Sequence, residues 1–289
     1  AICDILKDNL EETRELCNDA ANWGAKVSIH TCDVSSEKQV TSFCDEVKSV
    51  HQTQFINLLF NNAGTGGGHS FLLDNRDVWD KTFAVNWFGV YYCTRAFMPM
   101  LIAGKEGHLI NTSSVNGFWA NLGPERPYTA SSSAKFAVKG FSESLLVDLR
   151  LNAPHVKITL VMPGHVGTSI AVNTAKIHGK PSIEEMTPDQ LSALRTRMIE
   201  SGSIDQQVTN DDLRKQMILR RDSFRDNAPM SAQQAATSIL SAVRKGVWRV
   251  LIGEDAIFLD DYIRKNPQAA YDPAVYSEVE HKVSQMFQK

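Results

Sequence analysis

The stretch Ile56-Asn57-Leu58-Leu59-Phe60-Asn61-Asn62-Ala63-Gly64 decides the fold, because it passes abruptly from an apolar run to polar residues and a glycine. The apolar part, Ile56 to Phe60, predicts a short buried strand. The polar part that follows predicts a turn directly after the strand. Buried strands with polar ends recur along the chain, so this stretch is one unit of a larger pattern.

Five other segments repeat the pattern, and helical segments separate them. We expect strands over Ala1–Ile5, Lys26–Cys32, His108–Thr112, Val156–Met162 and Trp248–Ile252. The segments between carry apolar residues at helical spacing, such as Val40, Phe43, Cys44 and Val47. This alternation predicts an α/β fold with a doubly wound parallel sheet and helices on both faces. The ligand is then expected at the carboxyl edge of the sheet, where the polar strand ends gather.

The 289 residues are expected to form one such domain over residues 1–289. Residues 170–227 are polar and helical and show no strand pattern, so they are interpreted as an insertion. This insertion either covers the site as a lid or is a solvated helical excursion, and the sequence favours neither. Pro267 to Lys289 is expected to form a helical tail.

Composition excludes several classes of protein. The 30 Lys and Arg and 33 Asp and Glu residues give a net charge of -3, without the basic excess of a nucleic-acid-binding protein. No apolar run has the roughly 18 residues that a membrane-spanning helix needs. The 5 cysteines and 8 histidines have no metal-ligand spacing, so no metal site is expected. Cysteines in apolar segments indicate buried, reduced thiols and a cytoplasmic location.

Five motifs, in a fixed order, resemble those of the classical short-chain dehydrogenase/reductase family. They are Asn61-Asn62-Ala63-Gly64, Asn86, Asn111-Thr112-Ser113-Ser114, Ser132-Ser133-Ala134-Lys135 and Pro163-Gly164-His165-Val166-Gly167-Thr168. The resemblance covers about residues 1–170 and the strand near Trp248. It implies a Rossmann-type fold, a nicotinamide cofactor, and hydride transfer between a secondary alcohol and a ketone.

The resemblance also implies catalytic roles. Ser114 would hold the substrate oxygen by a hydrogen bond, and Asn86 would anchor a water that connects Lys135 to solvent. Lys135 would bind the nicotinamide ribose, and its charge would lower the pKa of a catalytic phenol. The family places this phenol, a tyrosine, four residues before the lysine, so that both side chains project from one helix face. In this sequence that position is Ser131.

Ser131 departs from the family pattern at the centre of the chemistry. A serine hydroxyl is shorter by a ring and does not ionise usefully near neutral pH. Tyr128 is nearby, but its use requires three extra residues before Lys135, which we expect to rotate the two side chains apart by most of a turn. We therefore assign Ser131 to the tyrosine position. An introduced, inactivating substitution and a natural non-catalytic member both explain Ser131, and the otherwise intact site favours the first.

Cofactor contacts are also implied by the resemblance. Asp4 ends a strand where an acid accepts hydrogen bonds from the adenosine ribose, which favours NAD over NADP because a carboxylate repels the phosphate of NADP. An exposed acid before a helix N-terminus is the alternative interpretation. Asp33 and Val34 are expected at the adenine, Asn62, Ala63 and Gly64 at the ribose and pyrophosphate, and Val166 and Thr168 at the nicotinamide amide. Further cofactor contacts are expected from Lys135, Pro163 and Gly164.

The glycine-rich loop TGxxxGxG, which cradles the pyrophosphate in the family, is not found in this sequence. The first residues resemble the second strand of the family, so we expect a preceding strand and helix of about 30 residues. Without that strand, Ala1–Ile5 and Ile56–Phe60 would flank a gap of unpaired backbone.

The sequence carries fewer signals for the substrate and for the oligomeric state than for the fold and the cofactor. Phe118 and Trp119 follow Ser114 and favour an apolar alcohol or ketone, although core packing explains them equally well. The helix after Lys135 carries an apolar stripe. The corresponding helix of the family packs against its twin in a dimer or tetramer, so the resemblance implies a homodimer or homotetramer. Packing of the stripe on the sheet of its own chain is the alternative. The stripe consists of Val138, Phe141, Leu145 and Leu149. The competing function is a catalytically dead, cofactor-binding or scaffold protein.

Overall fold

The computed structural model describes residues 1–20, 24–120, 127–200 and 202–286. The chain forms two compact units. The first consists of Ala1–Gly164 together with Gln233–Lys289, and the second of His165–Ala232.

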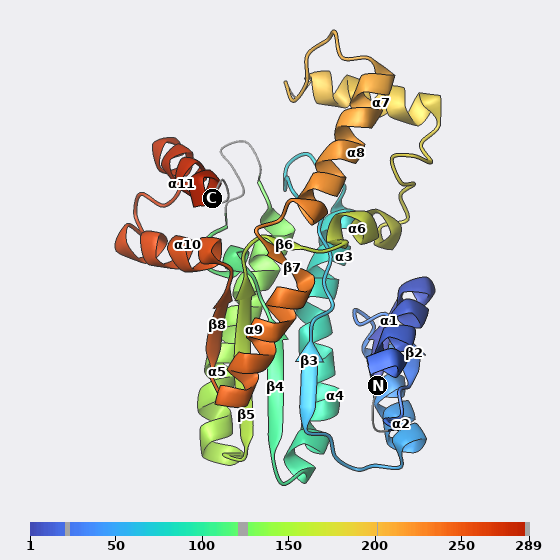
Figure 1. Ribbon diagram of the computed structural model, residues 1–289, viewed down its shortest axis with the longest axis vertical. Helices are drawn as coiled ribbons and strands as arrows, with labels where there is room; N and C mark the ends of the chain where they lie inside the picture. The colour runs from blue at the N-terminus through green and yellow to red at the C-terminus, as the bar shows by residue number, and fades with distance from the viewer. Residues whose placement is uncertain (21–23, 121–126, 201, 287–289) are drawn as a thin grey trace. The chain divides into compact units, whose positions relative to one another are not determined.

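A four-stranded parallel sheet forms the centre of the first unit (Figure 1). Its strands lie in the order β3 (Leu58–Asn61), β4 (Gly107–Thr112), β5 (Val156–Pro163) and β8 (Arg249–Ile252). All three pairings are parallel, and Asn61 lies opposite Asn111 at the carboxyl ends of β3 and β4. The predicted α/β fold with a parallel sheet is therefore confirmed, and the polar strand ends share one edge of the sheet.

Two long helices cover one face of this sheet. They are α4 (Gly89–Ala103) and α5 (Thr129–Asn152). Leu101 of α4 and Leu149 of α5 belong to one buried apolar cluster with Leu109 of β4 and Ile158 of β5. Burial of these side chains stabilises the layer by roughly 1.5 to 3 kcal/mol for each residue. A further helix, α9 (Ala232–Lys245), crosses in front of the strands in Figure 1.

A second, smaller sheet lies apart from the first. It consists of β1 (Ile2–Asp4) and β2 (Ile29–Thr31), which pair in parallel with each other and with no other strand among the described residues. Among the described residues β3 also pairs only with β4, so β1 and β3 each have one edge without a hydrogen-bonded neighbour strand. The additional strand expected between them stays a prediction.

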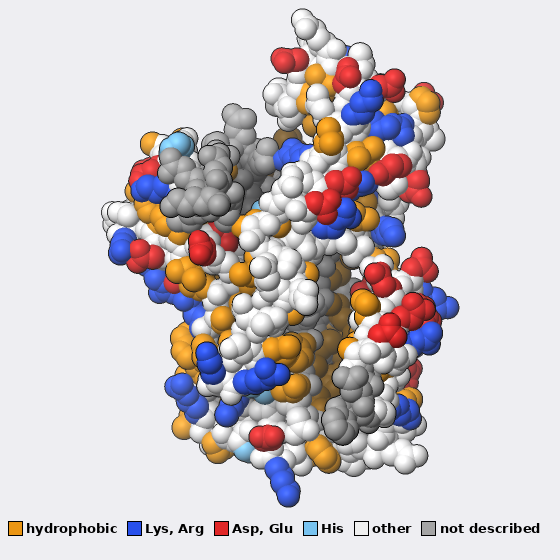
Figure 2. All heavy atoms as spheres, viewed as in Figure 1, with side chains coloured by type: hydrophobic (Ala, Val, Ile, Leu, Met, Phe, Trp, Pro, Cys, Tyr) orange, Lys and Arg blue, Asp and Glu red, His pale blue; other side chains and the backbone are white. Residues whose placement is uncertain are grey.

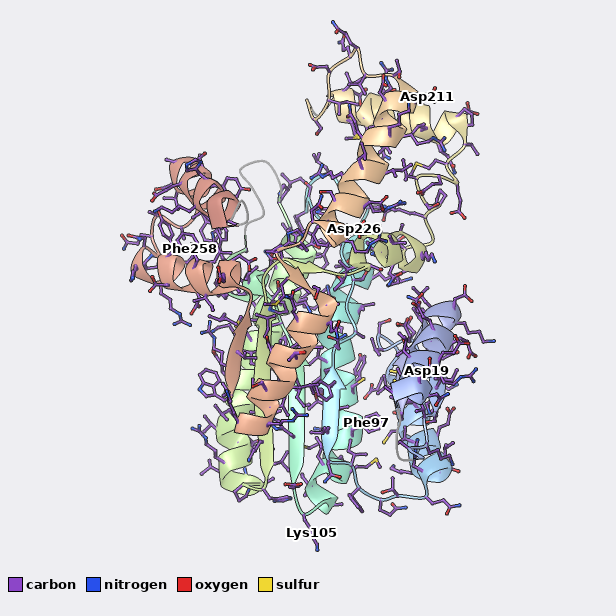
Figure 3. The ribbon with its side chains drawn as sticks, in the orientation of Figure 1. Asp19, Phe97, Lys105, Asp211, Asp226 and Phe258 are labelled. Carbon is purple, nitrogen blue, oxygen red and sulfur yellow. The ribbon has the colours of Figure 1, made fainter. Side chains whose placement is uncertain are left out.

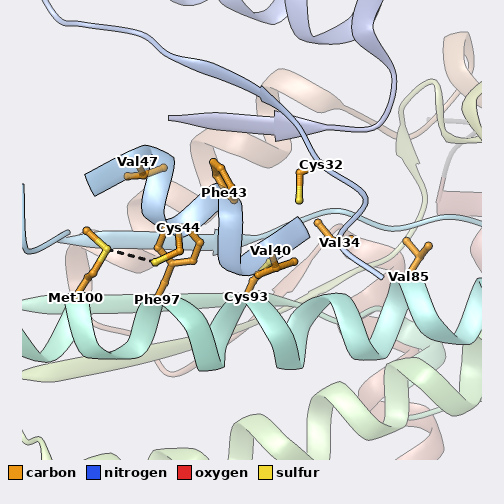
Figure 4. Close-up of a cluster of buried hydrophobic side chains, with 10 residues drawn as sticks. All are labelled: Cys32, Val34, Val40, Phe43, Cys44, Val47, Val85, Cys93, Phe97 and Met100. Carbon is orange, nitrogen blue, oxygen red and sulfur yellow. Dashed lines mark hydrogen bonds between the residues drawn. The ribbon is translucent and has the colours of Figure 1, made fainter. Parts of the chain in front are cut away.

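Side-chain packing connects the small sheet to the large one (Figure 4). Between the sheets, α2 (Glu37–His51) packs against α4, and the Phe43 and Phe97 rings meet edge to face at 5.2 Å. The Cys44 thiol donates a hydrogen bond to the Met100 sulfur at 3.7 Å. All four residues predicted for the apolar side of α2 are buried: Val40, Phe43, Cys44 and Val47.

Apolar side chains remain exposed on β3. Leu58 and Phe60 are 50% and 42% exposed, while Asn61 at the end of the strand is buried. Figure 2 shows hydrophobic side chains on the surface of the lower part of the first unit. These exposures leave one face of β3 uncovered by the described residues.

The other helices of the first unit show local irregularities. In α1 (Lys7–Ala20) Leu10 is buried but Leu16 is 63% exposed. The segment before α4 consists of α3 (Arg76–Phe83) and a π-helical turn η1 (Ala84–Phe88). The helix that contains Lys135 is α5, which already starts at Thr129.

The C-terminal region contains one helix that the sequence prediction missed. α10 (Glu254–Lys265) precedes α11 (Pro273–Met286), which lies within the predicted helical tail. Glu254 and Asp255 in the first turn of α10 and Arg264 and Lys265 in its last turn are the charge signals that could have identified it.

The second unit is mainly helical, and the expectation of one domain over residues 1–289, with residues 170–227 as an insertion, stays a prediction. The unit contains α6 (Ile170–Ile177), α7 (Pro188–Glu200) and α8 (Asn210–Asp226). Figure 3 labels Asp211 and Asp226 near the two ends of α8. Leu191 and Leu213 are buried together in a small core. A short parallel pair, β6 (Val166–Gly167) and β7 (Met230–Ser231), completes this unit. Its role as a cover over a site stays a prediction.

Candidate active site

A buried amide fixes the polar turn after β3. Asn86 in η1 is fully buried, its Oδ1 accepts a hydrogen bond from the Thr65 N–H at 2.9 Å, and its Nδ2 donates to the Thr65 carbonyl at 2.8 Å. A Cβ atom on Gly64 would lie 3.0 Å from Asn86 Oδ1. The turn is therefore held tightly against η1, and a π-helical turn of this kind often marks a functional position.

Lys135 reaches the same turn from α5. Its Nζ donates to the Thr112 carbonyl at 2.9 Å, and a Cβ on Gly64 would lie 3.7 Å from it. Burial lowers the pKa of Lys135 to about 8, because desolvation disfavours the ammonium form. The lysine is thus charged at neutral pH but loses its proton more readily than an ordinary lysine.

The buried lysine predicts a specific pH dependence of stability. Between pH about 8 and 10.5 the unfolded chain binds more protons at Lys135 than the folded chain, so the free energy of unfolding rises with pH across this range. Chemical denaturation at several pH values would measure this, with Lys135→Met as the variant that lacks the group. The difference between the two proteins should grow in favour of the natural chain over this range, and a constant difference would contradict the lowered pKa.

Ser114 lies where β4 and β5 end. It precedes a short 3-10 turn η2 (Val115–Gly117), and its Oγ accepts the Asn116 N–H at 3.2 Å. The hydroxyl also lies 3.5 Å from the Pro163 carbonyl oxygen at the end of β5. A hydrogen bond of this length is weak, so the hydroxyl is able to turn toward a substrate oxygen.

The segments that carry Ser114 and Lys135 are fastened to each other. The Ser113 Oγ donates to the Lys135 carbonyl at 2.8 Å. A Cβ on Gly117 would lie 2.9 Å from the same carbonyl oxygen, so this close approach requires glycine. The end of β4 and the Lys135 turn of α5 therefore form one rigid arrangement.

The first turn of α5 brings a serine and a tyrosine together. Ser131 is 5% exposed and lies one turn before Lys135. Burial raises the pKa of the Tyr128 phenol, while the nearby Ser131 side chain and Gly67 backbone act to lower it. Tyr128 itself stands just outside the helix, with φ -140° and ψ 51°, so the helical rotation expected between Tyr128 and Lys135 does not determine its direction.

Two buried serines of α5 give opposite expectations for stability. Ser132 Oγ has no hydrogen-bond partner among the described residues, whereas Ser142 Oγ accepts from Asn111 Nδ2 at 3.0 Å and donates to the Val138 carbonyl at 2.7 Å. Chemical denaturation should show Ser132→Ala stabilising the protein by up to about 1 kcal/mol and Ser142→Ala destabilising it by about 1 to 3 kcal/mol. Similar losses in both variants would contradict the hydrogen bonding described.

The two acids expected at the cofactor, Asp4 and Asp33, also accept hydrogen bonds from nearby backbone N–H groups. Asp4 Oδ1 accepts the Leu6 N–H at 2.8 Å before α1, and Asp33 Oδ1 accepts hydrogen bonds from the Ser35 N–H and hydroxyl at 2.9 and 2.6 Å. Val34 packs into the core, since a Cβ on Gly89 would lie 2.7 Å from its Cγ2. Asp4 and Asp33 thus lie at the carboxyl ends of the small sheet, and the side chain of Val34 points into the core.

The remaining expected contacts fall into two groups. Asn62 and Ala63 are exposed at the end of β3, and Pro163 and Gly164 end β5 in the first unit. Val166 and Thr168 belong to the second unit. No cluster of three metal-ligating side chains occurs among residues 1–20, 24–120, 127–200 and 202–286.

The aromatic pair after Ser114 is mainly structural. Trp119 is 4% exposed, and its Nε1 donates to the Ala270 carbonyl at 2.8 Å. It packs in a cluster with Leu259 and Ile263 of α10, and Phe118 packs against the same cluster. Core packing therefore explains Trp119, and the sequence signal for an apolar substrate is correspondingly weaker.

The family model named short chain dehydrogenase matches residues 1–178, which is more than half of the chain. The chain belongs to the short-chain dehydrogenase family.

None of the helices in the described ranges is long and apolar enough to cross a membrane.

Individual members of the family support this membership. SadH of Mycobacterium tuberculosis, whose name describes an oxidoreductase, is 29% identical over 261 residues, which are 90% of this chain and 79% of SadH. The mouse epidermal retinol dehydrogenase 2 is 34% identical over 168 residues, which are 58% of this chain and 52% of that enzyme.

The fold is shared with solved members of this family. The crystal structure of a short chain dehydrogenase/reductase from Burkholderia phymatum in complex with NAD matches with a TM-score of 0.70 and 25% identity, and covers 94% of this chain and 85% of that one. A short-chain dehydrogenase from Streptomyces avermitilis matches in fold, with a TM-score of 0.60 and 22% identity.

Proposed function

We propose that this short-chain dehydrogenase interconverts a secondary alcohol and a ketone with NAD(H). The observation that carries the proposal is the junction of β4 and α5, where the Ser113 hydroxyl binds the Lys135 carbonyl. This contact holds a hydroxyl, Ser114, and a buried ammonium, Lys135, at one edge of the sheet. A hydrogen-bond donor and a cation are the groups that stabilise the negative charge developing on a substrate oxygen.

The residues at this edge fit a nicotinamide cofactor. Lys135 lies beside Gly64, where a side chain would meet Asn86 Oδ1 at 3.0 Å, so a glycine suits this turn close to Asn86 and Lys135. Asp4 ends β1 and offers a carboxylate to ribose hydroxyls, which favours NAD over NADP. The NAD complex of the Burkholderia phymatum relative supports the same preference. When bound, the nicotinamide supplies or accepts the hydride.

A homodimer or homotetramer is supported by Val147 and Leu151 of α5, which are 56% and 76% exposed, whereas Val138 and Leu149 of the predicted stripe are buried in the core of their own unit. The five cysteines are free thiols, which supports a reducing compartment such as the cytoplasm.

Ser131 supports a second candidate, cofactor binding without turnover. The hydroxyl is buried at the position of the family tyrosine and cannot ionise near neutral pH. On this basis we expect the chain with Ser131 to be far slower than the same chain with tyrosine there. Binding alone does not separate the two functions, because both retain the cofactor residues.

The test combines measurements of cofactor binding and of turnover. Nicotinamide fluorescence would measure the Kd values for NADH and NADPH, and NADH absorbance would follow turnover on a panel of apolar secondary alcohols and ketones. We expect tighter binding of NADH, with the preference reduced in Asp4→Asn. Absence of binding by both cofactors would refute the cofactor assignment, and binding without turnover in every variant would favour the scaffold function.

A further inference from the structure

A serine, a histidine and a glutamate form a hydrogen-bonded chain between β2 and α2. The Ser28 hydroxyl lies 2.9 Å from His30 Nε2, and His30 Nδ1 lies 2.6 Å from Glu46 Oε2. Ser28 directly precedes β2 and its carbonyl continues the β1–β2 ladder, so its side chain projects from the same face of the strand as that of His30. The chain begins at the amino end of β2, whereas Asp33, an acid expected at the cofactor, follows the carboxyl end.

The chemistry of these side chains fixes the direction of each hydrogen bond. An ionised Glu46 only accepts, so His30 Nδ1 carries a proton, and the neutral imidazole then accepts at Nε2. The Ser28 hydroxyl therefore donates its proton to His30 Nε2. The second partner of Ser28 is His51 Nε2 at 2.8 Å, which must donate to the serine oxygen because the single hydroxyl proton is already used. The oxygen of Ser28 thus has a base on one side and a hydrogen-bond donor on the other.

The imidazole of His30 is fixed and shielded, while the serine is accessible. The His30 side chain is only 5% exposed, and the Phe43 ring lies 5.0 Å from it between ring centroids. Ser28 is half-buried, and the Glu46 side chain is 59% exposed. A hydroxyl that ligands can reach, next to a base that a carboxylate orients, is the arrangement that activates a serine as a nucleophile.

A pocket of about 330 Å³ opens beside the imidazole. Its walls include His30 and Glu46, together with Phe43, Ser36 and Gln39. The volume is at the lower end of the range of small-molecule sites. Phe43 offers an apolar surface, and Ser36 and Gln39 offer uncharged polar groups. The pocket therefore suits a small, uncharged molecule with a short apolar part, such as an ester of a short carboxylic acid.

We propose that Ser28, His30 and Glu46 form a second catalytic site, which hydrolyses small carboxylic esters. Ser28 Oγ attacks the ester carbonyl carbon as His30 Nε2 takes the hydroxyl proton, and His51 Nε2–H donates to the oxygen that becomes negative. The bond between the carbonyl carbon and the alcohol oxygen then breaks, and the alcohol leaves with the proton from His30. Water attacks the acyl-serine in the same way, so the acid is released and Ser28 regains its proton. The reaction uses no nicotinamide and is independent of the proposed dehydrogenase function.

The first test labels the activated serine in the natural chain, so that no substitution disturbs folding. A fluorophosphonate reacts with a nucleophilic serine by forming an oxygen–phosphorus bond and releasing fluoride, and peptide mass mapping locates the label. We expect label on Ser28, at the same rate with and without NADH. Ser49 is the internal control, because it is an exposed serine of the same helix α2. Absence of label from Ser28, or equal labelling of Ser28 and Ser49, would overturn the proposal.

The second test measures hydrolysis of p-nitrophenyl acetate without cofactor, by the absorbance of the released nitrophenolate. Ser28→Ala should reduce the rate to that of buffer, while Ser49→Ala should retain the rate of the natural chain. Glu46→Gln no longer fixes the tautomer of His30, so kcat should fall by about 10²- to 10⁴-fold with KM unchanged. Far-ultraviolet circular dichroism would establish that each variant is folded. Hydrolysis at the natural rate by folded Ser28→Ala would overturn the role of Ser28.

Discussion

Replacing Ser131 by tyrosine is expected to raise kcat/KM by about 10² to 10⁴, the largest gain available from one substitution in this chain. The substitution places a phenol four residues before Lys135, so both groups project from the same face of α5. The Lys135 charge then lowers the pKa of the new phenol directly.

Ser131→Phe is the matched control for this substitution. Ser131 is 5% exposed, so either ring must displace its neighbours, at a cost of about 1 to 3 kcal/mol in stability. Phenylalanine introduces the same ring without the hydroxyl, so it should lose stability similarly and gain no activity. Steady-state turnover on the most active substrate would measure both, and equal rates for the two variants would contradict the assignment of position 131.

Asn86→Leu is expected to be the most damaging single substitution in the site. The amide of Asn86 holds both the N–H and the carbonyl of Thr65, and removing partners from two buried backbone groups costs about 1 to 3 kcal/mol each. Loss of this attachment also releases the turn at Gly64, so cofactor affinity should fall together with stability.

Asn57→Leu provides the comparison for Asn86→Leu. Its Nδ2 also donates to a backbone carbonyl, that of Glu106 at 3.1 Å, but the contact is exposed. Chemical denaturation should therefore show a loss below about 1 kcal/mol for Asn57→Leu. Comparable losses in both variants would show that the Asn86 attachment is not what stabilises the turn.

The sequence predicted the sheet and its polar edge because both depend on local pattern. An apolar run that ends in Asn61-Asn62-Ala63-Gly64 signals a buried strand and a turn, and parallel pairing places Asn61 opposite Asn111. The buried face of α2 was predicted for the same reason, since helical spacing places Val40, Cys44 and Val47 on one side. Membership of the family was likewise visible in the order of the motifs.

Other features depend on contacts that no local pattern contains. The π-helical turn at Asn86 forms where the side chain attaches to Thr65, across 21 residues of sequence. The early start of α5 depends on the His69 and Gly68 carbonyls, which accept the first N–H groups of the helix from a distant loop. The orientation of Tyr128 could not be predicted because the sequence argument assumed regular helix geometry, whereas Tyr128 stands outside α5 with φ -140° and ψ 51°.

The separate pairing of β1 and β2 has a consequence for local opening. Among the described residues these two strands share a ladder only with each other, and the apolar packing of α2 on α4 contributes to their attachment to the rest of the first unit. Such a layer can open as a unit without breaking the hydrogen bonds of β3, β4 and β5. Amide hydrogen exchange should therefore be faster at Ile29–Thr31 than at Gly107–Thr112, with the thiols of Cys32 and Cys44 becoming reactive toward alkylating reagents in the same opening event.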